Sequence, residues 1–291
     1  MAIRINVNGN LGTEKDLLLS PLDLGFVFGA SVYETLRTYR GRPFLLERHL
    51  TRLRESAASL GIPLDLNDQQ IMDRIEKTLT AASNPESYVR LIVSAGVGEL
   101  DYRRTPGREP RPTIVILVKP LPEVPVRIYQ EGIRVAVVGV VRNHPKSVSP
   151  RIKTSNLLNN MFALREAHAR GAEEAVMLSY RGEVAEGSQT NVFLVKDRVV
   201  KTPTVDVGIL AGITRELVLR LTAEQGFETK ESVISPEELL HADEVFITSS
   251  TREVVPVVEV DDTRIGDGRP GPVTLALLAA YRERVGSSGT S

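Results

Sequence analysis

Three observations in the sequence predict an α+β protein with two domains. The chain has 291 residues, which is long for a single small core and suits two domains. Segments with strand-like and with helix-like patterns occur in both halves. The segment 119–125 has three prolines in seven residues and is stiff and extended, as a linker would be. We therefore expect a first domain at 1–118, a linker at 119–126 and a second domain at 127–291.

The composition is that of an ordinary soluble globular protein, with 42% hydrophobic and 25% charged residues. A formal net charge of -1 gives no electrostatic argument for nucleic acid or an anionic membrane. The N-terminus does not resemble a signal peptide, and the longest apolar run, 114–118, is too short to span a bilayer. We expect a cytoplasmic protein.

Two residue types bear on metal and thiol chemistry. The chain has no cysteine, so thiolate chemistry and disulfides are excluded. Its four histidines are widely spread, which makes a histidine-rich metal site improbable. We therefore expect no metal.

The first half predicts strands followed by two helices. Asn8-Gly9 marks a hairpin, and 26–39 is rich in strand formers. Apolar residues from Leu46 to Leu60 recur on one helical face, and a second helix is expected at 68–82, capped by Asn67 or Asp68.

Two strands, 88–94 and 113–119, complete the first half. The long loop between them, 96–112, lacks the third glycine of a dinucleotide fingerprint, but loops of this length often carry function.

In the second half strands and helices continue to alternate. Strands are expected at 133–138, 175–179, 190–195 and 244–248. A helix follows Lys153, and two further helices are expected at about 214–226 and 271–285.

Lys153 is the candidate nucleophile. It stands just before an apolar helical pattern, and a lysine screened from water there loses proton affinity and becomes a usable Schiff-base amine. Most lysines lie on the solvated surface, so the residues downstream of Lys153 must decide whether it is a nucleophile.

Glu186, expected in a turn between two strands, could pair with a protonated pyridine nitrogen, although a surface glutamate is the simpler interpretation. Gly208–Arg215 opens a helix whose amides and Thr214 hydroxyl suit a phosphate, or form an ordinary cap. The hydroxyls of Thr248–Thr251 could add phosphate donors or merely form a turn.

These features together resemble the class IV (fold type IV) pyridoxal-phosphate enzymes, which include branched-chain aminotransferases, D-amino-acid transaminases and aminodeoxychorismate lyases. The resemblance extends from Phe28-Gly29 to Gly268-Arg269 and lies in specific motifs: Glu186-Gly187-Ser188 with Asn191, Gly212–Arg215, and Glu244-Val245-Phe246 followed by Ser249-Ser250-Thr251. It implies a small α/β N-terminal domain, a larger C-terminal domain with a β-barrel-like core, and a homodimer whose site lies near the subunit interface.

The resemblance also implies roles for individual residues. Lys153 would carry pyridoxal 5'-phosphate as an aldimine and shuttle the proton during transfer of an amino group to a 2-keto acid such as 2-oxoglutarate. Glu186 would face the pyridine nitrogen, and Leu210 would pack on the ring. The remaining cofactor-binding candidates are Arg48, Asn191, Gly212, Ile213, Thr214, Ser250 and Thr251.

The subgroup stays open between three activities. Tyr88-Val89-Arg90 matches the Tyr-x-Arg that binds the substrate carboxylate in branched-chain aminotransferases, which favours that activity. Against it, Tyr33-Glu34-Thr35 replaces Phe-Glu-Gly, and Leu157 stands where that subgroup has a tyrosine. A threonine near Thr35 is associated with elimination in the lyases.

The D-amino-acid transaminases are the third candidate, although Leu100 and Tyr102 stand in place of their carboxylate-trapping arginine and histidine. The substrate-facing candidates are Phe28, Tyr33, Thr35, Arg37 and Arg90. A catalytically silent binding protein would lack the lysine or the glutamate, and both are present.

Overall fold

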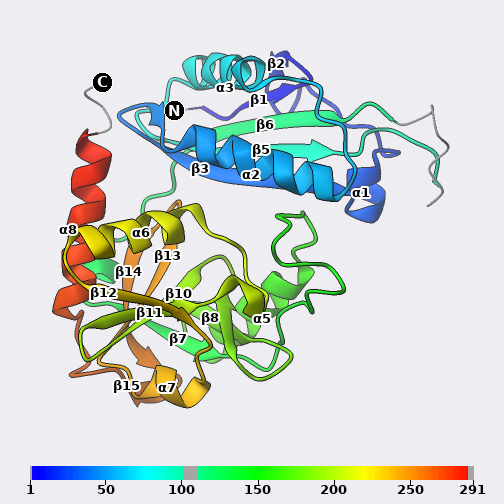
Figure 1. Ribbon diagram of the computed structural model, residues 1–291. Coiled ribbons are helices and arrows are strands. Elements are labelled where there is room, and N and C mark those ends of the chain that lie inside the picture. The colour runs from blue at the N-terminus through cyan, green and yellow to red at the C-terminus, as the bar shows by residue number, and fades with distance from the viewer. Residues whose placement is uncertain (1, 101–109, 288–291) are drawn as a thin grey trace. The chain divides into compact units, whose positions relative to one another are not determined.

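The computed structural model of the protein describes residues 2–100 and 110–287, which divide into two compact units (Figure 1). Unit 1 comprises Met1–Pro122 and Ile152–Asn156, and unit 2 comprises Glu123–Arg151 and Leu157–Ser291. The first division falls within the expected linker. The return of Ile152–Asn156 to unit 1 was not expected, and it assigns Lys153 to the smaller unit.

Unit 1 is built on a six-stranded sheet in the order β2-β1-β6-β5-β3-β4. All its neighbouring strands pair antiparallel. The strands are β1 Arg4–Val7, β2 Asn10–Gly12, β3 Ser31–Tyr39, β4 Arg42–Pro43, β5 Ser87–Ser94 and β6 Thr113–Pro120.

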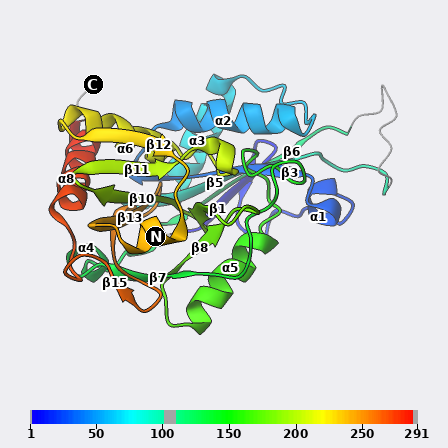
Figure 2. The ribbon, with the colours of Figure 1, turned by 60° about the horizontal axis from the view of Figure 1, so that its bottom comes forward.

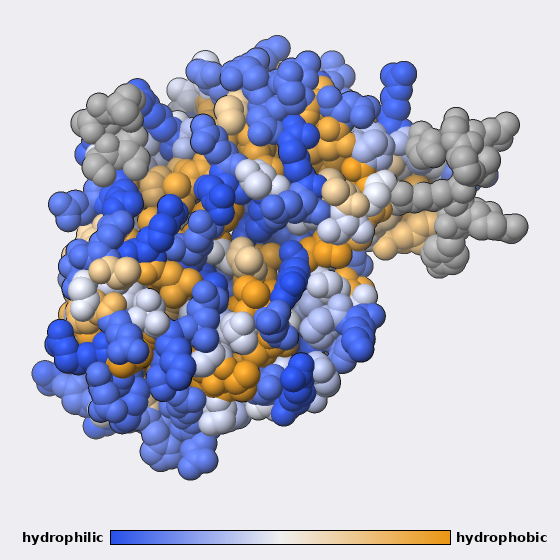
Figure 3. Space-filling model, viewed as in Figure 1, coloured by the Kyte–Doolittle hydropathy of each residue, from blue (hydrophilic) through white to orange (hydrophobic). Residues whose placement is uncertain are grey.

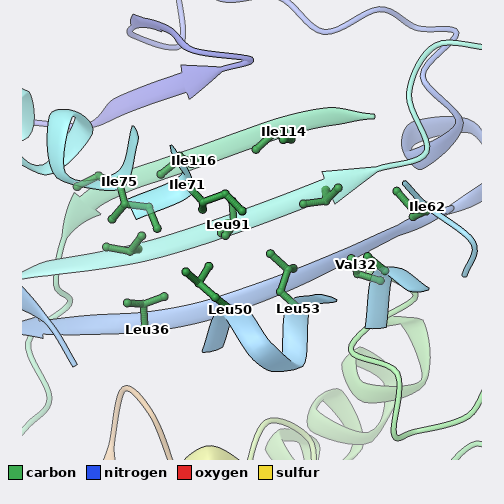
Figure 4. Close-up of a cluster of buried hydrophobic side chains, with 14 of the residues drawn as sticks. Val32, Leu36, Leu50, Leu53, Ile62, Ile71, Ile75, Leu91, Ile114 and Ile116 are labelled. Carbon is green, nitrogen blue, oxygen red and sulfur yellow. The ribbon is translucent and has the colours of Figure 1, made fainter. Parts of the chain in front are cut away.

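The two long helices of unit 1, α2 (Leu46–Ser59) and α3 (Asp68–Ala82), confirm the expected helices and cover one face of this sheet (Figure 1). The apolar face of each helix packs on alternate strand residues, such as Leu36 and Leu91, to form the core drawn in Figure 4. Asn67 caps α3 in a reciprocal capping box with Gln70, because each side chain receives a backbone N–H of the other residue. The other face of the sheet, called the open face below, is not covered by these helices and carries half-buried side chains.

The expected strand at 26–39 is wrong in its first part. Leu24–Phe28 forms the short helix α1, whose first turn is capped by the Asp23 carboxylate accepting from the Gly25 N–H. Gly29 ends α1 with a positive φ of 66°, and the chain then enters β3. A capped helix followed by glycine therefore overrides the strand propensity of Phe26-Val27-Phe28.

Unit 2 is built on a nine-stranded sheet in the order β12-β11-β10-β13-β14-β7-β8-β9, with β15 beside β14. The terminal strand β9 also packs against β10 and β11, so the sheet curls back on itself (Figure 2) and confirms the expected barrel-like core. The strands are β7 Ile133–Val137, β8 Glu174–Leu178, β9 Val184–Gly187, β10 Asn191–Lys196, β11 Val199–Pro203, β12 Glu228–Ser232, β13 Glu244–Ser249, β14 Glu253–Val260 and β15 Thr263–Arg264.

The helices of unit 2 include those expected after Lys153, near 214–226 and near the C-terminus. Helices α6 and α8 pack against each other and against β13. The helical segments are α4 Arg127–Gln130, α5 Leu158–Ala169, η1 Val205–Val207, α6 Ile213–Glu224, α7 Pro236–Leu240 and α8 Pro272–Ser287. Among the described residues no helix is long and apolar enough to cross a membrane.

Candidate active site

Lys153 is fixed to unit 1 through its backbone. The segment Ile152–Asn156 pairs with β3, because the Tyr33 N–H donates to the Lys153 carbonyl at 2.9 Å and the Ser155 N–H donates to Ser31 at 3.0 Å. The Lys153 N–H donates to the Ser56 hydroxyl of α2 at 3.2 Å. Three hydrogen bonds to two elements thus hold the backbone around the half-buried lysine.

A buried ionic cluster lies near Lys153, in the layer between β3 and α2. The Glu34 carboxylate receives the Arg52 Nε–H at 2.7 Å and an Nη2–H at 2.8 Å. Its Oε2 atom also lies 2.7 Å from His49 Nδ1. Every partner of Glu34 in this cluster can donate a hydrogen bond, so the carboxylate is held as an acceptor.

The ionisation of this cluster follows from its burial and pairing. Burial raises the pKa of the Glu34 carboxyl, but the charge and hydrogen bonds of Arg52, together with His49, outweigh it and hold the pKa at about 2. Burial lowers the pKa of His49, opposed by Glu34 and assisted by the charges of Arg52 and Lys153. At neutral pH the cluster is therefore a carboxylate, a guanidinium and a neutral imidazole.

Arg52 is a residue that the sequence analysis missed. The expected phosphate ligand Arg48 is exposed on α2, whereas the Arg52 side chain is only 11% exposed and its charge reaches the same imidazole as that of Lys153. The sequence did contain one indication of Arg52: it follows His49 by three residues, and residues three apart in a helix lie on the same face. The role predicted for Arg48 stays a prediction, and Arg52 is a second candidate for it.

Tyr33 brings Lys153 and a substrate-facing candidate together. The Lys153 Nζ atom lies 4.6 Å from the centroid of the Tyr33 ring, and the Arg90 guanidinium carbon lies 4.0 Å from it. Arg90 is paired with Thr35 across β3 and β5. The candidate nucleophile and a cation able to bind a carboxylate therefore lie around one aromatic ring.

The other substrate-facing candidates are distributed along the same unit. Arg37 follows Thr35 on the open face of β3, with its guanidinium carbon 4.1 Å from the Tyr39 ring centroid. Phe28 is the last residue of α1 and is half-buried. Leu100 is exposed, and Tyr102 lies outside the described residues.

Glu186 lies in β9 rather than in the expected turn, and it is buried. Arg142 donates to its Oε1 atom at 2.7 Å. Its Oε2 atom accepts the Leu210 N–H at 3.0 Å and the Asn191 amide at 3.3 Å. Both carboxylate oxygens of Glu186 therefore act as hydrogen-bond acceptors, as a group that faces a pyridinium N–H must.

Gly212 permits a close approach beside Glu186. A Cβ atom at Gly212 would lie 1.9 Å from the Asn191 Oδ1 atom, so any larger residue there would have to displace the Asn191 side chain. Gly212 also precedes the first turn of α6, where Ile213 and Thr214 are buried. The backbone amides of a helix N-terminus attract anions.

Two further features of unit 2 suit an anionic ligand. The buried Thr248 hydroxyl on β13 has no hydrogen-bond partner among the described residues. After β13 the turn Ser250–Arg252 carries the remaining predicted hydroxyls, and Arg252 Nη2 donates at 2.5 Å to the buried Glu174. An orphan hydroxyl, a hydroxyl-bearing turn and a helix N-terminus fit a phosphate group.

These residues and the curled second sheet place the protein among the fold type IV enzymes that depend on pyridoxal phosphate. The chain belongs to the amino-transferase class IV family, whose model matches residues 31–260.

Curated relatives with three different names resemble the chain over nearly its whole length. The putative branched-chain-amino-acid aminotransferase of Methanocaldococcus jannaschii is 36% identical, covering 97% of this chain and 96% of the relative. Aminodeoxychorismate lyase of Bacillus subtilis is 35% identical, with 97% and 94% covered. D-alanine aminotransferase of Bacillus licheniformis is 32% identical, with 97% of each covered.

Solved structures resemble the whole fold as well. The branched-chain amino acid aminotransferase of Escherichia coli gives a TM-score of 0.90 at 29% identity, covering 96% of this chain and 93% of that one. The T.th. enzyme of the same name, solved with pyridoxamine 5'-phosphate, gives 0.91 at 29% identity, covering 97% and 93%. The expected family, fold type and cofactor are confirmed.

Proposed function

We propose that the protein transfers an amino group from a branched-chain L-amino acid to a 2-keto acid such as 2-oxoglutarate. The observation that carries this proposal is the grouping of Lys153, Tyr33 and Arg90, since Arg90 belongs to the Tyr-x-Arg motif of that subgroup. The relative in Methanocaldococcus jannaschii and the solved structures named above support it.

We propose a cofactor role for each of the predicted residues. Lys153 would bind pyridoxal phosphate covalently, and Glu186 would accept the pyridinium N–H. The phosphate would be bound by Arg48 or Arg52, by the α6 residues Ile213 and Thr214, and by the turn that includes Ser250 and Thr251. Asn191, Leu210 and Gly212 would shape the site around Glu186.

The cofactor, when bound, withdraws electrons from the substrate and makes its Cα–H acidic. The Lys153 amine would then act as a general base that removes this proton, and afterwards as a general acid that returns it on the cofactor. Arg90 would bind the substrate carboxylate, while the Tyr33 ring, which lies close to both cations, would orient Lys153 and Arg90. Glu186 would be held in place as an acceptor, because Arg142, Asn191 and the Leu210 N–H all donate to it.

A second candidate is the lyase that forms 4-aminobenzoate from aminodeoxychorismate. Thr35 favours it, because this residue lies on the half-buried face of β3 opposite Arg90 of β5, and its hydroxyl is 3.5 Å from the Tyr88 hydroxyl. The relative from Bacillus subtilis supports this candidate, and that from Bacillus licheniformis supports a D-amino-acid transaminase.

A homodimer is also part of the proposal. Large apolar side chains are exposed on α1 and on the segment before it, where Phe26 of α1 is 79% and the preceding Leu18 is 86% exposed. Figure 3 shows this apolar surface over α1. On α5, Leu158 and Met161 are 64% and 62% exposed. Such surfaces mark protein contacts in soluble proteins.

The experiment begins with the purified protein and added pyridoxal phosphate. A yellow protein that bleaches with borohydride, and a Lys153 peptide that then carries a phosphopyridoxyl group, would support the cofactor assignment. L-leucine, D-alanine and aminodeoxychorismate are then tested in turn. A keto acid from L-leucine supports the main proposal, whereas pyruvate and 4-aminobenzoate from the third would overturn it.

A further inference from the structure

The open face of the unit 1 sheet carries a cluster of polar side chains around Tyr88. Half-buried residues on this face alternate with core residues along each strand, as strand geometry requires. Tyr88 of β5 is paired with Arg37 of β3 on one side and with Lys119 of β6 on the other. Arg90 follows Tyr88 on the same face.

Two cations lie against the Tyr88 side chain. The Lys119 Nζ atom is 4.8 Å from the centroid of the Tyr88 ring, and Arg90 Nη1 is 3.5 Å from its hydroxyl oxygen. The Thr35 hydroxyl lies 3.5 Å from the same oxygen. Burial raises the pKa of Tyr88, but Thr35, Arg90 and Lys119 outweigh it and lower the pKa below its usual value.

Neither cation has a carboxylate partner in the part of the chain that the structure describes. Within residues 2–100 and 110–287, Arg90 and Lys119 form no ion pair, although both are half-buried. Other arginines of the unit are paired, as Arg52 is with Glu34 and Arg54 is with Asp68. A partly desolvated cation without an anion is unfavourable unless a ligand supplies the charge.

We propose that Lys119 determines acceptor specificity by binding the second carboxylate of a dicarboxylic keto acid, so that such acceptors are preferred over monocarboxylic keto acids of equal length. This inference rests on the proposed aminotransferase function. Lys119 and Arg90 are diagonal neighbours across β5 and β6, at roughly 7–8 Å between backbones. The side chains can therefore reach the two ends of a short dicarboxylate.

The test compares two inhibitors of equal length on the protein loaded with pyridoxal phosphate. Glutarate carries two carboxylates and pentanoate carries one. Calorimetry is expected to show that Lys119→Met weakens glutarate binding about tenfold, as loss of one charged hydrogen bond implies, and leaves pentanoate unchanged. Lys119→Arg keeps the charge and is expected to retain most of the glutarate affinity.

Lys77→Met is the matched control, because Lys77 is an exposed lysine of α3, the helix that covers the opposite face of the sheet. It is expected to bind both inhibitors like the wild type. In steady state, Lys119→Met should raise the KM for 2-oxoglutarate about tenfold and leave kcat and the KM for 2-oxopentanoate unchanged.

Two negative results can be told apart. If Lys119→Met weakens both inhibitors equally, or neither, while transamination continues, the role of Lys119 is overturned and the proposed function stands. If no amino acid is transaminated by the wild type, the proposed function fails. In that case glutarate binding, and its dependence on Lys119, still decides whether this face holds a dicarboxylate.

Discussion

Glu34 is the residue whose ionisation is most tightly tied to the fold. It is completely buried, and its charge is balanced by Arg52 and hydrogen-bonded by His49. A lowered carboxyl pKa means that the unfolded chain binds a proton at a higher pH than the native protein does. The contribution of the Glu34 carboxylate to the free energy of unfolding is therefore fully present above pH 4.5. It is lost as the pH falls towards about 2.

Glu34→Gln is expected to lower the free energy of unfolding at pH 6 by about 3 kcal/mol, because a shift from 4.5 to about 2 corresponds to that amount. Urea unfolding at pH 6 and pH 3 measures it. The difference between wild type and variant should shrink at the lower pH. Glu76→Gln, at an exposed position of α3, is the control. A constant difference at both pH values would show that Glu34 is not the titrating group.

The Arg142–Glu186 pair is a second buried ion pair, with side chains 10% and 6% exposed. Removal of one partner leaves an uncompensated buried charge, so Arg142→Met should destabilise the protein by about 3 kcal/mol. The exposed pair Arg151–Asp206 provides the comparison, and Arg151→Met should change stability by less than about 1 kcal/mol. If Arg142→Met and Arg151→Met lowered the free energy of unfolding equally in chemical unfolding, the Arg142–Glu186 pair would not behave as a buried pair.

Single residues show what the sequence could and could not predict. Glu186 was predicted from a specific motif, and Lys153 from the apolar helical pattern that follows it together with the family resemblance; the roles of both residues stay predictions. Arg52 was missed because helical periodicity puts several arginines of α2 within reach, and only the packing of β3 shows which one meets Glu34. Lys119 carried no motif at all, and its neighbours became visible only through strand register.

At the scale of elements, helices were predicted better than the strands of unit 2. Helix α3 has a capping box and a periodic apolar face, both of which are local signals. Strand β9 has four residues, all buried, and pairs with β8 through an irregular register. Such a short strand has no alternating pattern to detect, so Glu186 was predicted in a turn.

The start of α6 gives a prediction at this scale. Gly212 has a φ of -70°, which alanine tolerates, so Gly212→Ala tests steric contact alone. Displacement of the Asn191 side chain should destabilise the protein by about 2 kcal/mol and weaken its affinity for pyridoxal phosphate. Gly286→Ala in α8, where a Cβ atom meets nothing within 4 Å, should be neutral or slightly stabilising. If Gly212→Ala and Gly286→Ala had equal thermal stability and equal affinity for pyridoxal phosphate, the close contact between position 212 and Asn191 would be refuted.

At the scale of the whole molecule, two domains and their family were predicted from the sequence. The predicted domains were each one continuous segment, whereas unit 1 also includes Ile152–Asn156. The prolines at 120–125 are visible in the sequence, whereas the pairing of Lys153 with Tyr33 joins residues 120 positions apart. No local pattern predicts a contact over that separation.

Assembly gives the last prediction. Phe26→Asp puts a charge on the exposed apolar surface of α1 and should weaken the proposed dimer by about 2 kcal/mol or more. Analytical ultracentrifugation would measure the change. Val233→Asp, at a 55% exposed position of unit 2, should leave assembly unchanged. A wild type that sediments as a monomer at all concentrations would disprove the dimer.

The return of Ile152–Asn156 to the β3 edge has a consequence for biosynthesis. A nascent chain that has reached Pro122 holds all six strands of its first sheet, yet the flank of β3 waits for residues made later. A truncated protein ending there would expose that flank to other chains and would lack the reactive amine. Folding of unit 1 can therefore be completed only after the ribosome has passed Asn156.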